Sequence, residues 1–215
     1  MAEDWTDSEN DLIVSDYFAM LSAEDVQTMG PRDWKRLLNE AHPVDESDLE
    51  GMEYLGTSMG LPRTVERLTW KTFVKAFVRD EPGGVLRGWN VRLRQERGEE
   101  AYAPMARSGI PVTFGHFHAV EPAGDHGGLT LDYGLGGNAP WDLTRLVRDP
   151  LVAVNRGSSD LLLGTMALQM GPWCIPTPSF FTLERLRPVT HRALSWKERR
   201  GPDALPAFTD DSRVH

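Results

Sequence analysis

The stretch from Pro111 to Val120, which reads Pro-Val-Thr-Phe-Gly-His-Phe-His-Ala-Val, decides the fold that the sequence predicts. It is short, rich in residues that favour β-structure and bounded by Gly and Pro, which is typical of a β-strand. Because side chains alternate between the two faces of a strand, Phe114, His116 and His118 are expected on one face together with two valines. We therefore expect a strand that presents two imidazoles on an otherwise apolar face.

The residues after Gly51 contain further segments of this kind, separated by turns rich in Gly and Pro. The candidate strands are residues 52–59, 71–79, 85–95, 111–120, 129–133, 151–155, 161–170 and 179–186. Short turns between successive strands favour an antiparallel meander over a βαβ fold. Eight strands can close into a barrel that holds one small ligand and leaves no exposed edge. The sequence thus predicts a mainly β protein, an antiparallel up-and-down β-barrel of about eight strands preceded by two α-helices.

The segment before the barrel has helical periodicity. Apolar residues recur at helical spacing between Ile13 and Leu21, and a second helix is expected to start at Pro31, a favourable first-turn residue after Gly30. We expect three parts, which are a helical N-terminal extension (residues 1–43), the barrel (residues 51–188) and a polar C-terminal tail (residues 189–215).

Composition excludes several classes of function. The formal charge of −9 argues against a general affinity for nucleic acid, which proteins bind through clustered Lys and Arg, and against adhesion to an anionic membrane. No apolar run approaches the roughly 18 residues that a membrane-spanning helix needs. The N-terminus has neither the basic nor the apolar region of a secretory signal, so we expect a cytoplasmic protein. The single cysteine excludes an internal disulfide framework.

Aromatic and apolar side chains in the predicted strands are numerous enough to line a cavity for a small apolar or aromatic molecule. The candidate ligand-binding residues are Trp70, Phe73, Phe77, Trp89, Val91, Phe114, Tyr133, Met166 and Phe181. The alternative is that they fill the barrel completely. Lys75 lies between two of them on one strand face, so either that face is outside or a cation lies in the cavity. Both alternatives stay open.

His116 and His118 are the candidate catalytic residues, because imidazole titrates near neutral pH and can act as a general acid or base. Together with Glu121 they resemble the His-x-His and Glu ligands of the metal-binding cupins. The spacing to Glu121 is one residue short, however, and the second-motif His of cupins has no counterpart. We therefore predict neither a metal site nor a cofactor.

Two short segments near the end of the predicted barrel resemble bacterial lipocalin-like (calycin) domains. They are Asp160–Gly164, which reads Asp-Leu-Leu-Leu-Gly, and Phe180–Arg185, which reads Phe-Phe-Thr-Leu-Glu-Arg. The resemblance implies a central cavity for a small molecule and covers residues 51–188. The chain lacks the Gly-x-Trp-x-Gly motif, because Gly88-Trp89 is followed by Asn-Val.

A second resemblance concerns the N-terminus. Residues 10–21 resemble the opening helix of a domain found in some bacterial HNH-type restriction nucleases. They include none of the catalytic His or Asn positions, so the resemblance implies no activity.

Three functions follow as hypotheses. The first is binding of a small apolar or aromatic molecule in the barrel. The second is an isomerase or cyclase that acts on such a molecule with a cavity histidine as general acid or base. The third is a protein-interaction module whose N-terminal helix docks a partner. The expected partner is a small ligand, with no nucleic acid and no membrane, and a homodimer stays an open option.

Overall fold

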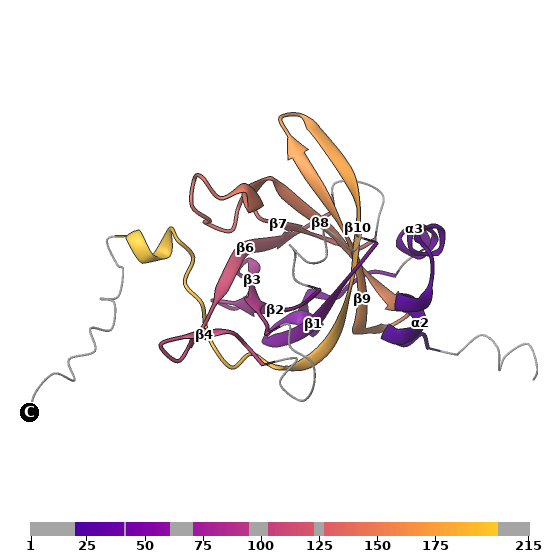
Figure 1. Ribbon diagram of the computed structural model, residues 1–215, viewed down its shortest axis with the longest axis horizontal. Helices are drawn as coiled ribbons and strands as arrows, with labels where there is room; N and C mark the ends of the chain where they lie inside the picture. The colour runs from indigo at the N-terminus through magenta and orange to yellow at the C-terminus, as the bar shows by residue number, and fades with distance from the viewer. Residues whose placement is uncertain (1–19, 41, 61–70, 95–102, 123–126, 202–215) are drawn as a thin grey trace, which may run out of the picture.

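Eight antiparallel strands close into a barrel in the computed structural model, which describes residues 20–40, 42–60, 71–94, 103–122 and 127–201 (Figure 1). The strands are β1 (Met52–Met59), β2 (Thr72–Arg79), β3 (Leu86–Arg92), β6 (Thr113–Val120), β7 (Leu129–Asp132), β8 (Val147–Asn155), β9 (Ser158–Met170) and β10 (Trp173–Pro188). They follow one another around the barrel in the order β1-β10-β9-β8-β7-β6-β3-β2, and the pairing of β2 with β1 closes it. The predicted fold class is confirmed, and at this coarse level the barrel is consistent with a lipocalin-like fold.

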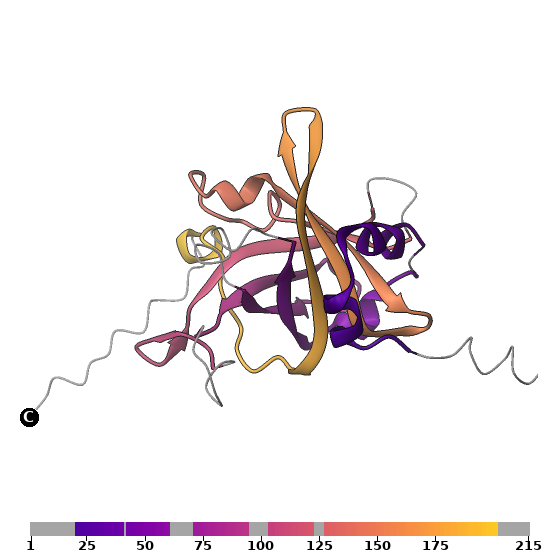
Figure 2. The ribbon, with the colours of Figure 1, turned by 45° about the vertical axis from the view of Figure 1, so that its right-hand side comes forward.

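The β9–β10 hairpin extends beyond the barrel wall as a projecting two-stranded ribbon (Figure 2). The sequence predicts separate strands at residues 161–170 and 179–186, and the absence of strand between them is wrong for most of residues 171–178. Trp173 pairs with Met170, and the pairing continues to Pro176 opposite Ala167. Proline is tolerated here because the ribbon lies outside the closed part of the sheet.

Small elements fill the remaining connections. Strands β4 (Ala106–Arg107) and β5 (Ile110–Pro111) form a separate short ribbon between β3 and β6. The described residues also include two 3-10 helices, η1 (Leu143–Leu146) between β7 and β8 and η2 (Glu198–Arg200) after β10.

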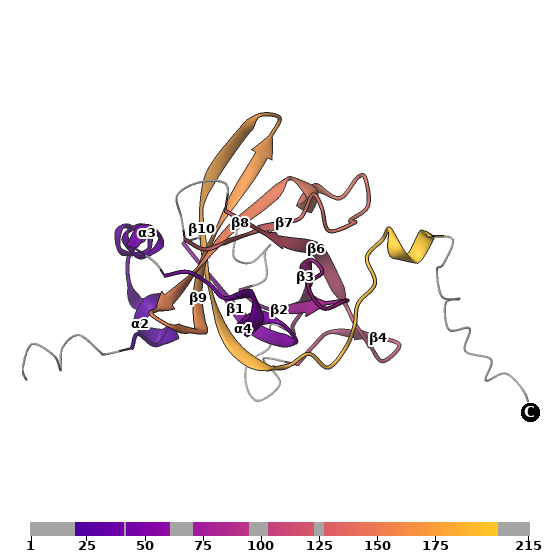
Figure 3. The same ribbon diagram turned by 180° about the vertical axis from the view of Figure 1, so that it is seen from behind.

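In the described part of the chain, three short helices precede the barrel, α2 (Ala23–Thr28), α3 (Pro31–Glu40) and α4 (Glu46–Leu49). Helix α2 begins with a capping box in which the side chains of Ser22 and Asp25 each accept a backbone N–H of the other residue. The predicted start of a helix at Pro31 is confirmed, whereas the first predicted helix falls almost entirely outside the described residues. Figure 3 shows α4 beside β1, which agrees with their contacts. No helix among the described residues combines the length and apolar character needed to cross a membrane.

Helices α2 and α3 cover the outer face of β8, β9 and β10 (Figure 1). The Trp34 indole N–H donates to the Val26 carbonyl at 2.8 Å and links the two helices. The buried residues of this outer cluster are Val26, Trp34, Met59, Val152, Val154, Leu161, Leu163 and Phe180. The apolar residues of β8, β9 and β10 therefore belong to two separate hydrophobic cores, one inside the barrel and one on its outer face.

A second outer cluster lies over β2 and β3, where the chain after β10 packs back on the barrel. Lys197 N–H donates to the Gly137 carbonyl at 3.0 Å, and Glu198 pairs with Arg87 at 2.7 Å. The buried residues of this cluster are Val74, Ala76, Trp89, Val91, Leu93 and Ala193. An apolar outer face is stable here because residues 189–195 remove it from water.

A β-bulge interrupts β6 in the middle of the stretch that decides the fold. Gly88 pairs with Phe117 and Asn90 pairs with Phe114, so two residues of β6 lie opposite the single residue Trp89. The first of the two is Gly115, whose φ of +54° is in the left-handed region that glycine adopts readily. This geometry is that of a glycine bulge. It breaks the simple alternation of faces along β6.

Candidate functional site

Four polar side chains meet inside the barrel, each from a different part of the wall. Lys75 lies on β2, Asn90 on β3, Tyr133 directly after β7 and Asp149 on β8. Each is between 2 and 4 % exposed. Polar groups buried this deeply are stable only when they are hydrogen-bonded, so their partners define the site.

The Lys75 ammonium has three N–H donors and three acceptors within reach. They are the Tyr133 hydroxyl, Asn90 Oδ1 at 2.9 Å and Asp149 Oδ2 at 3.4 Å. Tyr133 in turn donates its hydroxyl proton to Asp149 Oδ2 at 2.9 Å. Asn90 Nδ2 donates to the Gly115 carbonyl at 3.0 Å and lies 3.4 Å from the Tyr133 hydroxyl. Each N–H and O–H donor of the cluster therefore already has an acceptor.

One acceptor of the cluster is left over. Asp149 Oδ1 is buried and has no hydrogen-bond partner among the described residues. The other carboxylate oxygen, Oδ2, accepts from both Lys75 and Tyr133. Such a double acceptor is typical of an ionised carboxylate, so Oδ1 is an acceptor in need of a donor.

Burial and the Lys75–Asp149 pair act in opposite directions on the titration of the site. Burial lowers the pKa of Lys75, and the nearby Asp149 charge counteracts that shift. Burial also raises the pKa of Asp149, against the effect of Lys75. The pKa of Tyr133 is raised well above its ordinary value, first by burial and then by the Asp149 charge. Each partner thus favours the charged form of the other, whereas burial, the larger of the two effects, disfavours it.

Aromatic rings surround the Lys75 ammonium. Its Nζ lies 5.2 to 5.3 Å from the ring centroids of Phe73, Phe117, Tyr133 and Phe181. This separation is within the range of a cation–π interaction. Of the two alternatives that the sequence leaves open for Lys75, a cation inside the barrel is therefore the correct one.

Two of these rings lie directly over glycines of the neighbouring strands. A Cβ added to Gly56 would lie 2.2 Å from the Phe73 ring, and one added to Gly164 would lie 2.2 Å from the Phe181 ring. The two rings meet edge to face with centroids 6.0 Å apart. Glycine at both positions makes room for the rings, which occupy the space beside Lys75. A ligand that reaches Lys75 must therefore displace them.

Six of the nine predicted ligand-binding residues are described first. Phe73, Phe77, Tyr133 and Phe181 belong to the core inside the barrel. Phe114 pairs with Asn90, and its ring lies 5.5 Å from the Arg92 guanidinium. Met166 is partly exposed and, by the alternation of β9, faces the same side as Leu162.

Of the remaining three predicted residues, two face the outside of the barrel and one lies outside the described residues. Trp89 and Val91 belong to the outer cluster under the C-terminal segment, so their predicted place in the cavity is wrong. Trp70 lies outside the described residues. The alternation of β3 correctly groups Trp89 with Val91, but it does not indicate which face is inside.

The predicted inward orientation of His116 and His118 is also wrong. Beyond the Gly115 bulge, Phe117 and Ala119 belong to the inner core. His116 instead packs against Trp89 with ring centroids 6.1 Å apart, and His118 pairs with Arg87 on the outer face. Burial lowers the pKa of His116 to about 4 and also lowers that of His118. Both histidines therefore lie outside the barrel interior.

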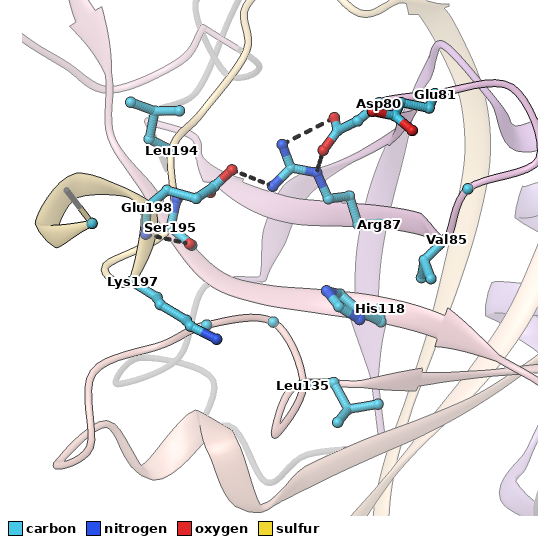
Figure 4. Close-up of a pocket in the computed structure, with 14 residues that line it drawn as sticks. Asp80, Glu81, Val85, Arg87, His118, Leu135, Leu194, Ser195, Lys197 and Glu198 are labelled. Carbon is cyan, nitrogen blue, oxygen red and sulfur yellow. Dashed lines mark hydrogen bonds and ion pairs between the residues drawn. The ribbon is translucent and has the colours of Figure 1, made fainter. Parts of the chain in front are cut away.

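A groove of about 750 Å³ lies on the outside of the barrel, beside His118 (Figure 4). Its walls are the β2–β3 turn, β6, residues 135–137 and the C-terminal segment. Arg87 is held there between two carboxylates, Asp80 at 2.8 Å and Glu198 at 2.7 Å. Because both carboxylates already neutralise the guanidinium, the groove offers little attraction for an anion.

The sequence singles out two residues of the polar cluster, Lys75 and Tyr133, and misses Asn90 and Asp149. Asp149 stands before Pro150 and outside the strand predicted for residues 151–155, whereas β8 begins at Val147 and includes it. The alternation of β2 could have located the cluster, because Lys75 between two phenylalanines requires a buried counter-charge once that face is inside. Among the described residues, no three His, Cys, Asp or Glu side chains are grouped to hold a metal ion.

Comparison with known proteins adds no relative, because no family model, no curated protein and no solved structure matches this chain. The functional argument therefore depends on the geometry of the barrel interior.

Proposed function

We propose that this protein binds a small apolar or aromatic molecule inside the barrel, beside the Lys75–Asp149 pair. The observation that carries the proposal is a charged pair buried among aromatic rings in a closed barrel. A buried ion pair contributes little to stability, and apolar residues of similar volume are often as stable. Perturbed titratable groups are concentrated at functional sites. Ligand recognition gives the pair a role that packing alone does not.

Binding would require the rings of Phe73 and Phe181 to rotate away from Gly56 and Gly164. The side chains of Phe73 and Phe181 fill the space against Gly56 and Gly164 that such a ligand would use. A planar aromatic ligand could then take the place of one ring and keep the same contacts with the others. This favours a molecule of about the size of one or two fused rings.

In this interior, Tyr133 and Asp149 are the side chains that would exchange a proton with a ligand. The isomerase or cyclase hypothesis assigns that role to His116 and His118, which lie on the outer face. The interaction-module hypothesis depends on the first predicted helix, almost all of which lies outside the described residues. Binding is therefore the function that we develop.

Intermolecular nuclear Overhauser effects with naphthalene test the proposal. We expect them between naphthalene protons and the rings of Phe117 and Tyr133 inside the barrel. Effects confined to Val85 and Leu135, which line the outer groove, would refute an interior site. His118→Ala is the matched control, because it alters the groove and should leave interior binding unchanged.

A further inference from the structure

The unpartnered oxygen of Asp149 indicates what chemical group a ligand must carry. Asp149 is 4 % exposed, and its Oδ1 has no partner among the described residues. Buried polar atoms in native proteins nearly always have a hydrogen-bond partner, and leaving one unsatisfied is destabilising. A donor from a bound molecule would complete the cluster.

The cluster itself has no donor to offer Oδ1. The three Lys75 N–H groups and the Tyr133 hydroxyl are directed at other acceptors. Both N–H groups of the Asn90 amide have acceptors within 3.5 Å, the Gly115 carbonyl and the Tyr133 hydroxyl. The missing donor must therefore come from outside the cluster.

The charge of the cluster restricts the ligand further. Lys75 and Asp149 neutralise each other, so a second charge would be buried without a counter-charge, which is strongly unfavourable. A carboxylate ligand would be repelled by Asp149, and a cationic ligand would lie close to the Lys75 ammonium. A neutral O–H donor avoids both costs.

We propose that the barrel interior selects a neutral aromatic molecule with a hydroxyl group, whose O–H donates to Asp149 Oδ1 while its ring packs among Phe73, Phe117 and Phe181. This inference rests on the proposed function and adds the class of ligand. The aromatic wall recognises the ring, and the carboxylate oxygen recognises the hydroxyl.

Calorimetric titration with 2-naphthol and 2-methylnaphthalene tests the inference, because the two probes differ only by hydroxyl against methyl. A hydrogen bond to a charged acceptor corresponds to a preference of about ten-fold or more. We expect the wild-type protein to bind 2-naphthol tighter by at least that factor.

Asp149→Asn should reduce this preference to less than about two-fold. The amide oxygen would keep the contacts with Lys75 and Tyr133, which places its NH2 group where Oδ1 stood. If this variant fails to fold, the double variant Lys75→Met/Asp149→Leu replaces it. The double variant should bind 2-methylnaphthalene at least as tightly as 2-naphthol.

The two proposals fail in different ways. Equal affinity of the wild-type protein for both probes would overturn the hydroxyl inference and would leave the binding function intact. No interior binding of either probe would overturn the proposed function as well. A preference for 2-naphthol that persists in Lys75→Met/Asp149→Leu, which leaves no polar side-chain group at residue 149, would show that another group recognises the hydroxyl and would also overturn the inference.

Discussion

At the scale of single residues, Lys75 and Asp149 depend on each other for their burial. Each is almost completely removed from water, and the Nζ–Oδ2 distance is 3.4 Å. The tyrosine and asparagine beside them complete the hydrogen bonds of the ammonium. Removing one partner would leave an uncompensated charge among aromatic rings.

We predict that Lys75→Met lowers the free energy of unfolding by about 3–5 kcal/mol, the usual effect of breaking a buried pair. The double change Lys75→Met/Asp149→Leu should recover most of that loss, because no charge then remains buried. Urea denaturation of both variants measures the difference. A single variant as stable as the wild type would show that the pair is not charged in the folded protein.

His116 predicts how stability depends on pH. Folding lowers its pKa from 6.5 to about 4 because the imidazole is buried. Between these values the unfolded chain binds a proton that the folded chain does not. The stability contributed by His116 is therefore complete above pH 6.5 and decreases as the pH falls toward 4, by up to about 1.4 kcal/mol per pH unit.

Chemical denaturation at a series of pH values checks this. His116→Phe should reduce the pH slope between 4 and 6.5, while His191→Phe on the C-terminal segment serves as the control. An unchanged slope in His116→Phe would contradict the assignment.

At the scale of the elements, the close contact between glycines and rings predicts how tightly the barrel interior is filled. A Cβ at Gly164 would lie 2.2 Å from the Phe181 ring. Gly164→Ala should therefore destabilise the protein by about 1–3 kcal/mol, the usual effect of overpacking a core. Gly30→Ala is the control, because a Cβ there meets nothing within 4 Å. Equal effects of the two changes on the denaturation midpoint would contradict the close packing of the Phe181 ring on Gly164 in the unliganded protein.

The strands illustrate what could be predicted from the sequence. Gly and Pro turns mark where strands end, so the number of strands and the antiparallel order were predictable, as was the helix start at Pro31. Alternation shows which residues share a face but not which face is inside. Trp89 and Val91 are apolar because residues 189–195 cover them. The Gly115 bulge then reverses the expected orientation of the histidines.

At the scale of the whole molecule, the barrel is covered on two sides by chain from outside it. Helices α2 and α3 cover β8 to β10, and the segment after β10 covers β2 and β3 (Figure 1). The polar cluster depends on side chains from four separate parts of the barrel wall. No local pattern could predict it, because the closure of the barrel brings these residues together.

We predict that truncation after Pro188 lowers the melting temperature by several degrees, because it exposes the outer cluster around Trp89. Loss of about 1 kcal/mol shifts the midpoint by roughly 2–4 °C in a protein of this size. Removal of residues 202–215 alone is the control and should have a smaller effect. Equal melting temperatures of the two truncated proteins would show that residues 189–201 do not stabilise the barrel.

The central claim, a ligand site beside Lys75, is tested most directly by the side-chain ammonium signals of protein labelled with ¹⁵N-lysine. The chain has four lysines, Lys35, Lys71, Lys75 and Lys197, and Lys197 lines the outer groove. On addition of 2-naphthol we expect the Lys75 Nζ signal to shift while the Lys197 signal stays in place. A shift of Lys197 with an unchanged Lys75 signal would place the ligand outside the barrel and contradict the account.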